Sequence, residues 1–316
     1  MTQPPTISVL MPVYNAQRYL AKAVESILNQ TFRDFEFLIV NDGSTDRSLT
    51  ILQRYAKQDD RIRLISRPNT GYLAALNEML LLAQGEFIAR MDADDIAMPE
   101  RFALQVAFLR QHPDVVCVGG AQDFIDEAGR ILFHYQAAED NDEIQRLALG
   151  GKTPINHPSA MMRRSAVLQV GGYDPTTYLA EDLDLWLKLG EIGKLANLPT
   201  TVTQYRQHSQ SESERKQAQQ QQMKRLVCER AWRRRGIQGE FTETQPWRPV
   251  DALSHHRQLV KYGWQFFMNR QRWAAIIYGI KAICTLPLNI QGWKLLIIAV
   301  IKPLPKTRPL STGQKL

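Results

Sequence analysis

"ISVLMPVY" at residues 7–14 is a nearly uninterrupted apolar run, and a second one, "FEFLIVND", follows at 35–42. Runs of this length and composition are typical of strands that are buried on both faces of a sheet. The segment between them, residues 16–30, has its apolar side chains at helical spacing. The strand pattern recurs twice, each time after a helical segment, at 61–67 and 86–92. Strands that alternate with helices predict a doubly wound α/β sheet.

The remainder of the chain changes character twice. Beyond Pro99, helical segments and strand-like segments follow one another less regularly, and from about residue 212 the chain becomes Gln-rich and basic, then amphipathic and aromatic. We therefore predict one α/β domain over 1–211, with halves at about 1–98 and 99–211, and a helical extension over 212–316.

Composition limits the possible partners. The 316 residues include 39 Lys and Arg against 32 Asp and Glu, a net charge of +7, which favours anionic lipid, nucleotide phosphates or nucleic acid. No nucleic-acid-binding motif is present, so we expect no nucleic-acid partner. Three distant cysteines without a CxxC pair suggest neither a zinc cage nor a disulfide framework. With no signal-peptide pattern and no apolar run of roughly 18 residues, we expect a cytoplasmic protein.

Three polar loops follow strands of the predicted sheet. They are "PVYNA" at 12–16, "NDGSTD" at 41–46 and "MDADD" at 91–95. Ligands of open α/β sheets bind beyond the carboxyl ends of the strands. We therefore expect these loops to converge on one site.

The spacing of the acids in the third loop points to a cation. Asp92 and Asp94 are two residues apart, so on an extended chain both carboxylates point to the same side. Carboxylate oxygens suit Mg²⁺ or Mn²⁺, which also bind substrate phosphates. The alternative is a solvated acidic loop or an acid at the start of the next helix. We prefer that alternative for Asp95 and the metal for the pair.

Two later stretches offer further candidates, each with a structural alternative. Glu181 and Asp182 in "AEDLDLW" lie at a probable helix start, where acids are stabilised by the helix dipole, but one of them could be a general base. Trp186 could offer a flat face to a sugar ring. Arg206 and His208 in "QYRQHSQSES" could meet a pyrophosphate or a metal, although a lone His is more often structural.

Two polar residues near the first loops also have both a functional and a structural interpretation. Asp42 could accept hydrogen bonds from a nucleobase or ribose, or it could be a turn acid before Gly43. Asn69 in "RPNTGYLAALN" could belong to a site or only to a helix entry.

Together these motifs resemble a known family. "SVLMPVYNAQRYLAKAVESILNQTFRDFEFLIVNDGSTDRS", followed by "GEFIARMDADD", "HPSAMMRR", "GGYD" and "EDLDLWLKL", resembles the inverting "family two" nucleotide-sugar glycosyltransferases of bacteria. The likeness covers residues 6–211 in the family's order and spacing. It implies the GT-A fold, with a mixed sheet, a nucleotide-sugar half over about 1–98 and an acceptor half over about 99–211.

The resemblance also implies roles for individual residues. Asp182 would be the catalytic base, with Glu181 as its substitute, and Asp94 of the D-x-D motif would bind Mg²⁺ or Mn²⁺ together with His208. The acceptor would meet Trp186 and His157. The nucleotide-sugar would be bound by Pro12, Val13, Tyr14, Asn15, Asn69, Asp42, Asp92 and Arg206.

One position departs from the family's pattern. Leu76 stands in "AALN" where many members carry Arg, so a basic contact to the donor is missing unless Arg67 or Arg90 replaces it.

The function implied is metal-dependent, inverting transfer of a sugar, most commonly from UDP in this family, to a glycan or lipid-linked acceptor in surface polysaccharide or glycolipid synthesis. The alternative is a non-catalytic, glycosyltransferase-like scaffold. A nucleotidyltransferase or dinucleotide dehydrogenase would need a Gly-rich loop after the first strand, and "VYNAQRYL" has none.

The extension has two interpretations. Its basic and aromatic helices could lie on an anionic membrane, as a peripheral attachment to the inner face of the plasma membrane, or they could pack on the catalytic domain.

Overall fold

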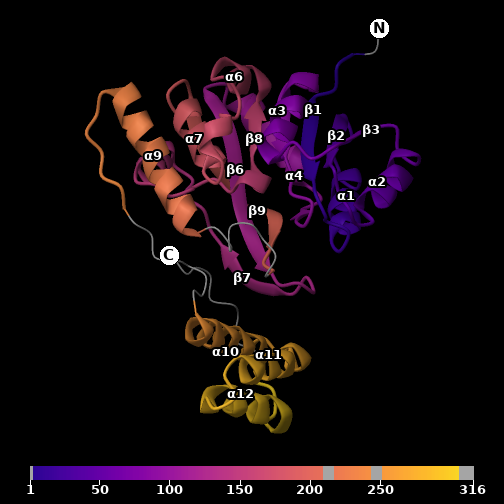
Figure 1. Cartoon of the computed structure of the whole chain (residues 1–316), viewed down its shortest axis with the longest axis vertical. Helices are drawn as coiled ribbons and strands as arrows, with labels where there is room; N and C mark the ends of the chain where they lie inside the picture. The colour runs from indigo at the N-terminus through magenta and orange to yellow at the C-terminus, as the bar shows by residue number, and fades with distance from the viewer. Residues whose placement is uncertain (1–2, 209–216, 243–250, 306–316) are drawn as a thin grey trace. The chain divides into compact units, whose positions relative to one another are not determined.

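The computed structural model describes residues 3–208, 217–242 and 251–305. The chain forms two compact units, Met1–Glu243 and Thr244–Leu316. Figure 1 shows the first as a sheet covered by helices and the second as a group of helices.

One mixed sheet forms the centre of the first unit. Its order is β3-β2-β1-β4-β8-β6-β9-β5, with β7 paired to β6. The strands β1 to β4 are parallel, whereas β8 is antiparallel to both of its neighbours. The strands are β1 (Ile7–Val13), β2 (Phe35–Asp42), β3 (Ile62–Arg67), β4 (Phe87–Arg90), β5 (Ile96–Ala97), β6 (Val115–Ile125), β7 (Ile131–Tyr135), β8 (Met161–Arg163) and β9 (Lys194–Arg206). The predicted α/β class and mixed sheet are confirmed.

Both faces of the sheet are buried because its strands are apolar at successive positions. Val9 and Met11 of β1 face one layer, and Leu10 between them faces the other. Helices α1 (Leu20–Leu28), α2 (Ser48–Ala56) and α4 (Arg101–Gln111) cover the first face. The second face is covered by α3 (Tyr72–Leu82), α5 (Asn141–Leu149), α6 (Arg164–Gln169) and α7 (Glu181–Leu189).

The first unit extends beyond the predicted boundary at residue 211. Helix α9 (Gln217–Arg235) lies beside α7 (Figure 1) and buries Val227, Cys228 and Ala231 against Leu183 and Leu187. The boundary predicted from composition was wrong because this polar, Gln-rich helix still carries a short apolar face. Basic side chains of α9 are also paired within the unit, as in the Arg230–Asp174 and Arg234–Glu191 ion pairs of 3.2 and 2.9 Å.

The second unit contains α10 (Ala252–Met268), α11 (Arg272–Thr285) and α12 (Ile290–Ile301). Its small core includes Phe266, Tyr278 and Leu295. Gly263 lets α10 approach α12 closely, because a Cβ there would lie 2.2 Å from the Cδ2 of Leu295. Within the three described ranges, no helix combines the length and the apolar character that a membrane span requires.

The packing of α9 predicts a stability effect far from any functional side chain. Val227→Asp would place a carboxylate in the α7–α9 contact and should lower the free energy of unfolding by roughly 3 kcal/mol or more. Arg233→Gln, on the exposed side of the same helix, is the control and should leave the free energy nearly unchanged. Equal urea midpoints for the two variants would show that α9 is not part of the unit.

Candidate active site

The loops after β1 and β2 are joined to each other. Asn15 has a left-handed backbone, with φ of 49°. Its side-chain oxygen accepts from the backbone N–H of Thr45 at 2.8 Å, and its own N–H donates to the hydroxyl of Ser44 at 3.0 Å. Pro12 and Val13 are buried beneath this junction, whereas the ring of Tyr14 is 54% exposed above it. The first two predicted loops therefore form one wall.

Asp42 holds a second junction. Its carboxylate accepts from the N–H groups of Thr70 and Gly71 at 3.0 and 2.9 Å and from the guanidinium of Arg67. Asn69 is exposed on the same loop, and its backbone N lies so close to Gly43 that a Cβ there would approach to 2.6 Å. Gly43 also has φ of 73°, so both its left-handed backbone and the close contact with Asn69 favour glycine at this position. Arg67 is thus engaged by Asp42, and Leu76 is a core residue.

Asp92 and Asp94 lie close together, as their spacing predicted, and Asp95 joins them. One oxygen from each of Asp92, Asp94 and Asp95 lies within 4.8 Å of the others. The guanidinium of Arg90 donates to Asp92 at 2.6 Å, and the Nε2 of His208 lies 2.8 Å from an oxygen of Asp94. His208 and Asp94 are far apart in the chain, so the structure brings the two predicted metal ligands together.

Asp95 is not the solvated helix-start acid that we expected. It is 1% exposed and accepts from the backbone N–H of Arg206 at 2.7 Å. The reason is β5, which pairs with β9 immediately after Asp95 and draws the carboxylate inward, while α4 begins only at Arg101.

Burial dominates the electrostatics of this cluster. It raises the pKa of Asp95 well above the ordinary range, with further increases from the charges of Asp94 and Asp92. Burial also raises the pKa of Asp92, against the opposing effect of Arg90. The second oxygen of Asp95 has no hydrogen-bond partner among the described residues. A divalent cation would fit this set, because it would relieve the repulsion among hard oxygen ligands.

The side chain of Arg206, at the end of β9, is buried and binds backbone carbonyls instead of being exposed in the site. It is 2% exposed, with Nε donating to the carbonyl of Asp94 at 2.8 Å and Nη1 to that of Asp126 at 3.0 Å. Its guanidinium carbon lies 4.6 Å from the centroid of Tyr19, whose ring centroid is 5.3 Å from that of His208. Tyr19 was not predicted from sequence, because it precedes a helix whose apolar pattern explained the neighbouring residues.

A buried network connects the acids to the other half of the unit. Arg90 is 1% exposed and also donates to the hydroxyl of Tyr72. That hydroxyl lies 3.2 Å from Nδ1 of His157, and Nε2 of His157 lies 2.8 Å from the hydroxyl of Tyr173. From sequence, Arg90 was considered only as a replacement contact to the donor. Its place in this network could also have been inferred, because a charged residue inside a buried strand needs a partner.

The acceptor residues predicted from sequence are both enclosed. His157 is 6% exposed and sits within this network, where burial and the charge of Arg90 lower its pKa well below the usual range. Trp186 is completely buried and donates to the carbonyl of Ile155 at 3.0 Å. Neither side chain can present a face to a sugar here, so this prediction was wrong. Trp186 lies on the same side of α7 as other core residues, where a large ring contributes most by being buried.

Glu181 and Asp182 occupy the first turn of α7. Leu179, just before them, has φ of 79°, which is strained for a residue other than glycine. An oxygen of Asp182 accepts from the N–H of Leu183 at 2.7 Å, while one oxygen of Glu181 is buried without a partner among the described residues. Burial, followed by the charge of Asp182, raises the pKa of Glu181 to about 8. Burial also raises the pKa of Asp182, against the charge of Lys224 from α9.

Comparison with known proteins identifies this arrangement. Residues 8–171 match the model of the family "Glycosyl transferase family 2". The chain belongs to this family. It is therefore a glycosyltransferase, as the resemblance in its sequence implied.

Its curated relatives match about two thirds of the chain. Over 215 residues, 66% of this chain and 76% of that protein, it is 37% identical to EpsE of Bacillus subtilis. It is 34% identical to the amylovoran biosynthesis glycosyltransferase AmsE of Erwinia amylovora, over 64% of this chain and 76% of that protein. Its 32% identity to the chondroitin synthase of Escherichia coli covers 61% of this chain but 28% of that protein.

Solved structures share the GT-A fold. The mannosyltransferase PcManGT of Pyrobaculum calidifontis, in complex with GDP-Man and Mn²⁺, has a TM-score of 0.56 at 18% identity, covering 94% of this chain and 79% of its own. TarS of S. aureus, residues 1–349 with UDP-GlcNAc, has a TM-score of 0.52 at 16% identity, with coverages of 93% and 79%.

The pKa of Glu181 predicts how stability depends on pH. Its pKa rises on folding from an ordinary value of 4.5 to about 8, so between these values the folded state holds a proton that the unfolded state has lost. This group therefore makes stability fall as pH rises through that interval. Glu181→Gln should raise the melting temperature at pH 8 and have much less effect at pH 5. Glu240→Gln, at an exposed position, is the control. An effect of Glu181→Gln that is equal at both pH values would contradict the assignment.

Proposed function

We propose that the protein transfers a sugar from a nucleotide-diphosphate donor, taken to be a UDP-sugar, to a hydroxyl of a glycan or lipid-linked acceptor, with inversion at the anomeric carbon. The observation that carries the proposal is the convergence of Asp92 and Asp94 after β4 with His208 after β9, next to the joined loops of β1 and β2. The reaction would serve surface polysaccharide or glycolipid synthesis at the cytoplasmic face of the plasma membrane. Relatives named for amylovoran and chondroitin synthesis support that context.

The nucleotide would lie against the wall formed by the first two loops. Tyr14 is exposed on this wall, Asn69 is exposed on the neighbouring loop after β3, and the hydrogen bonds of Asn15 join the two loops of the wall. Asp42 keeps the wall closed through three protein donors, and a carboxylate has lone pairs left for a base or ribose. Structures of the same fold with GDP-Man and UDP-GlcNAc support this donor class.

Asp94 and His208 would hold Mg²⁺ or Mn²⁺, with Asp92 beside the ribose and diphosphate. When bound, such an ion neutralises charge on a departing diphosphate. Arg206 would hold the segment that carries His208 next to the loop that carries Asp94, because its guanidinium donates to the carbonyls of Asp94 and of the 126–127 turn. The metal-bound PcManGT complex supports this choice of ions.

Asp182 would take the proton from the acceptor hydroxyl as its oxygen attacks the anomeric carbon. The new carbon–oxygen bond forms on the face opposite the bond to phosphate, which breaks, so no covalent intermediate arises. Glu181, with a pKa of about 8, holds its proton at neutral pH and leaves Asp182 as the acceptor of the proton. A non-catalytic scaffold would be expected to lose these acids or those of the D-x-D motif, and the chain has both.

Replacement of the base should separate chemistry from binding. Asp182→Asn keeps the shape of the side chain but cannot accept a proton, so donor hydrolysis, with water in place of the acceptor, should fall about 100-fold or more. Donor affinity measured by calorimetry should stay within about twofold, because the donor is held by the other loops. The donor would be chosen from a panel of UDP- and GDP-sugars by thermal stabilisation. Turnover equal to that of the unmodified protein would remove Asp182 from this role.

Metal binding has a readout that does not depend on activity. A saturating excess of Mn²⁺, about 100 times its dissociation constant, should raise the melting temperature by roughly 5–10 °C. Asp94→Ala should abolish this rise together with donor hydrolysis. Glu100→Gln, an exposed acid shortly after the loop, should preserve both. A rise that persists in Asp94→Ala would place the ion elsewhere.

A further inference from the structure

The second unit has an unusual charge balance. Between residues 251 and 305 there are seven lysines and arginines but only one acid, Asp251, whereas the whole chain has 39 and 32. Arg272 is held by carbonyls at the end of α12, including that of Ala299. The exposed bases include Lys281 on α11 and Lys294 on α12. This surface therefore favours an anionic partner.

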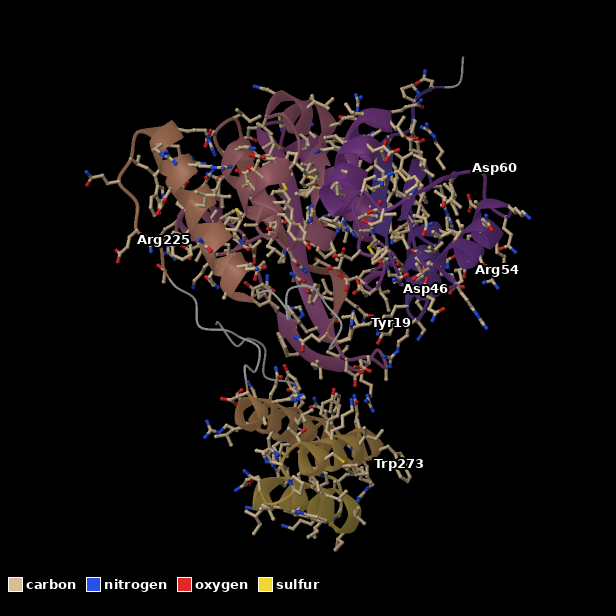
Figure 2. The ribbon with its side chains drawn as sticks, viewed as in Figure 1. Tyr19, Asp46, Arg54, Asp60, Arg225 and Trp273 are labelled. Carbon is tan, nitrogen blue, oxygen red and sulfur yellow. The ribbon has the colours of Figure 1, made fainter. Side chains whose placement is uncertain are left out.

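Two helices of the same unit carry exposed apolar stripes. On α11 the stripe recurs at intervals of four and three residues, and on α12 at three, four and four, so each lies on one side of its helix. The side chains are Trp273 (77% exposed), Ile277 (38%) and Ile280 (48%) on α11, and Ile290 (72%), Trp293 (46%), Ile297 (52%) and Ile301 (74%) on α12. Leu288, in the connection between the helices, is fully exposed. Figure 2 shows Trp273 projecting outward from the three helices.

We propose that these stripes, together with Lys281 and Lys294, form a membrane-contact face that lies in the interface of a bilayer with anionic headgroups. Each lysine lies four residues after a stripe residue of its own helix, Lys281 after Ile277 and Lys294 after Ile290, and therefore on the same side of that helix. Apolar and aromatic side chains would enter the boundary of the acyl chains, and the ammonium groups would meet lipid phosphates.

The charge balance selects this occupant over a second copy of the chain. Two such faces in contact would oppose one strongly basic surface with another, which disfavours association. Exposed isoleucine and tryptophan in this number are also costly to leave in water. An anionic bilayer satisfies both the apolar and the basic side chains at once.

The membrane-contact face deepens the proposed function, on which it rests, by naming the surface where a lipid-linked acceptor would be met. Binding to vesicles needs neither donor nor metal. Vesicle binding and donor hydrolysis can therefore fail independently, and each is measured on the same protein sample.

The test is co-sedimentation of the full-length protein with vesicles of phosphatidylcholine alone or with about 30% phosphatidylglycerol. The protein should bind the anionic vesicles and bind the neutral ones much more weakly. The double variant Lys281→Gln/Lys294→Gln should lower the partition coefficient on anionic vesicles roughly 30-fold. Trp273→Ser/Ile280→Ser should lower it at least about tenfold on the same vesicles.

Leu253→Ser is the matched control, because it removes an exposed apolar side chain from α10 instead of the striped helices. It should bind like the unmodified protein. Equal melting temperatures would show that the variants remain folded. Failure of the unmodified protein to bind anionic vesicles, or equal binding by all variants, would overturn the proposal. Concentration-dependent dimerisation without vesicle binding, lost in Trp273→Ser/Ile280→Ser, would instead assign the face to a second copy.

Discussion

The ion pair between the buried Arg90 and the half-buried Asp92 is the constraint around which the catalytic unit is organised. A guanidinium that is 1% exposed stands at the end of β4, directly before three acids, and its 2.6 Å contact with Asp92 compensates part of their charge. Burial raises the pKa of Glu181 and of Asp182, and the positive charge of Arg90 opposes part of that rise. The charge of one buried cation thus acts on both the predicted metal site and the predicted base. The hydrogen bonds from Arg90 to Tyr72 and from Tyr72 to His157 hold the guanidinium in a fixed position.

Local patterns predicted the features that depend on local chemistry. Strands buried on both faces are largely apolar, so β1 and β2 could be placed from sequence. The spacing of Asp92 and Asp94 indicated a shared target. The errors concern partners that are distant in the chain. Asp95 is buried by an interaction with Arg206, 111 residues away, and Trp186 donates to Ile155, 31 residues away. A helix-start acid and an aromatic residue look the same in sequence whether such partners exist or not.

The two basic regions of the C-terminal part illustrate the same limit. In α9, arginines pair with acids of the catalytic unit, such as Asp174 and Glu191, and an apolar face anchors the helix on α7. Residues 251–305 offer seven bases and one acid. From composition alone, both regions were predicted to belong to one C-terminal extension over 212–316. Packing assigns the first to the catalytic domain as a structural layer, while the second keeps exposed apolar stripes beside its lysines.

The central claim is that the acids after β4, together with His208, hold a cation for a nucleotide diphosphate. The most direct measurement is anomalous X-ray diffraction from crystals grown with Mn²⁺ and UDP. The account predicts a manganese peak within about 2.2 Å of a carboxylate oxygen of Asp94, with the diphosphate bound to the same ion. A peak beside Glu181 and Asp182, or UDP bound with no manganese near Asp94, would contradict it.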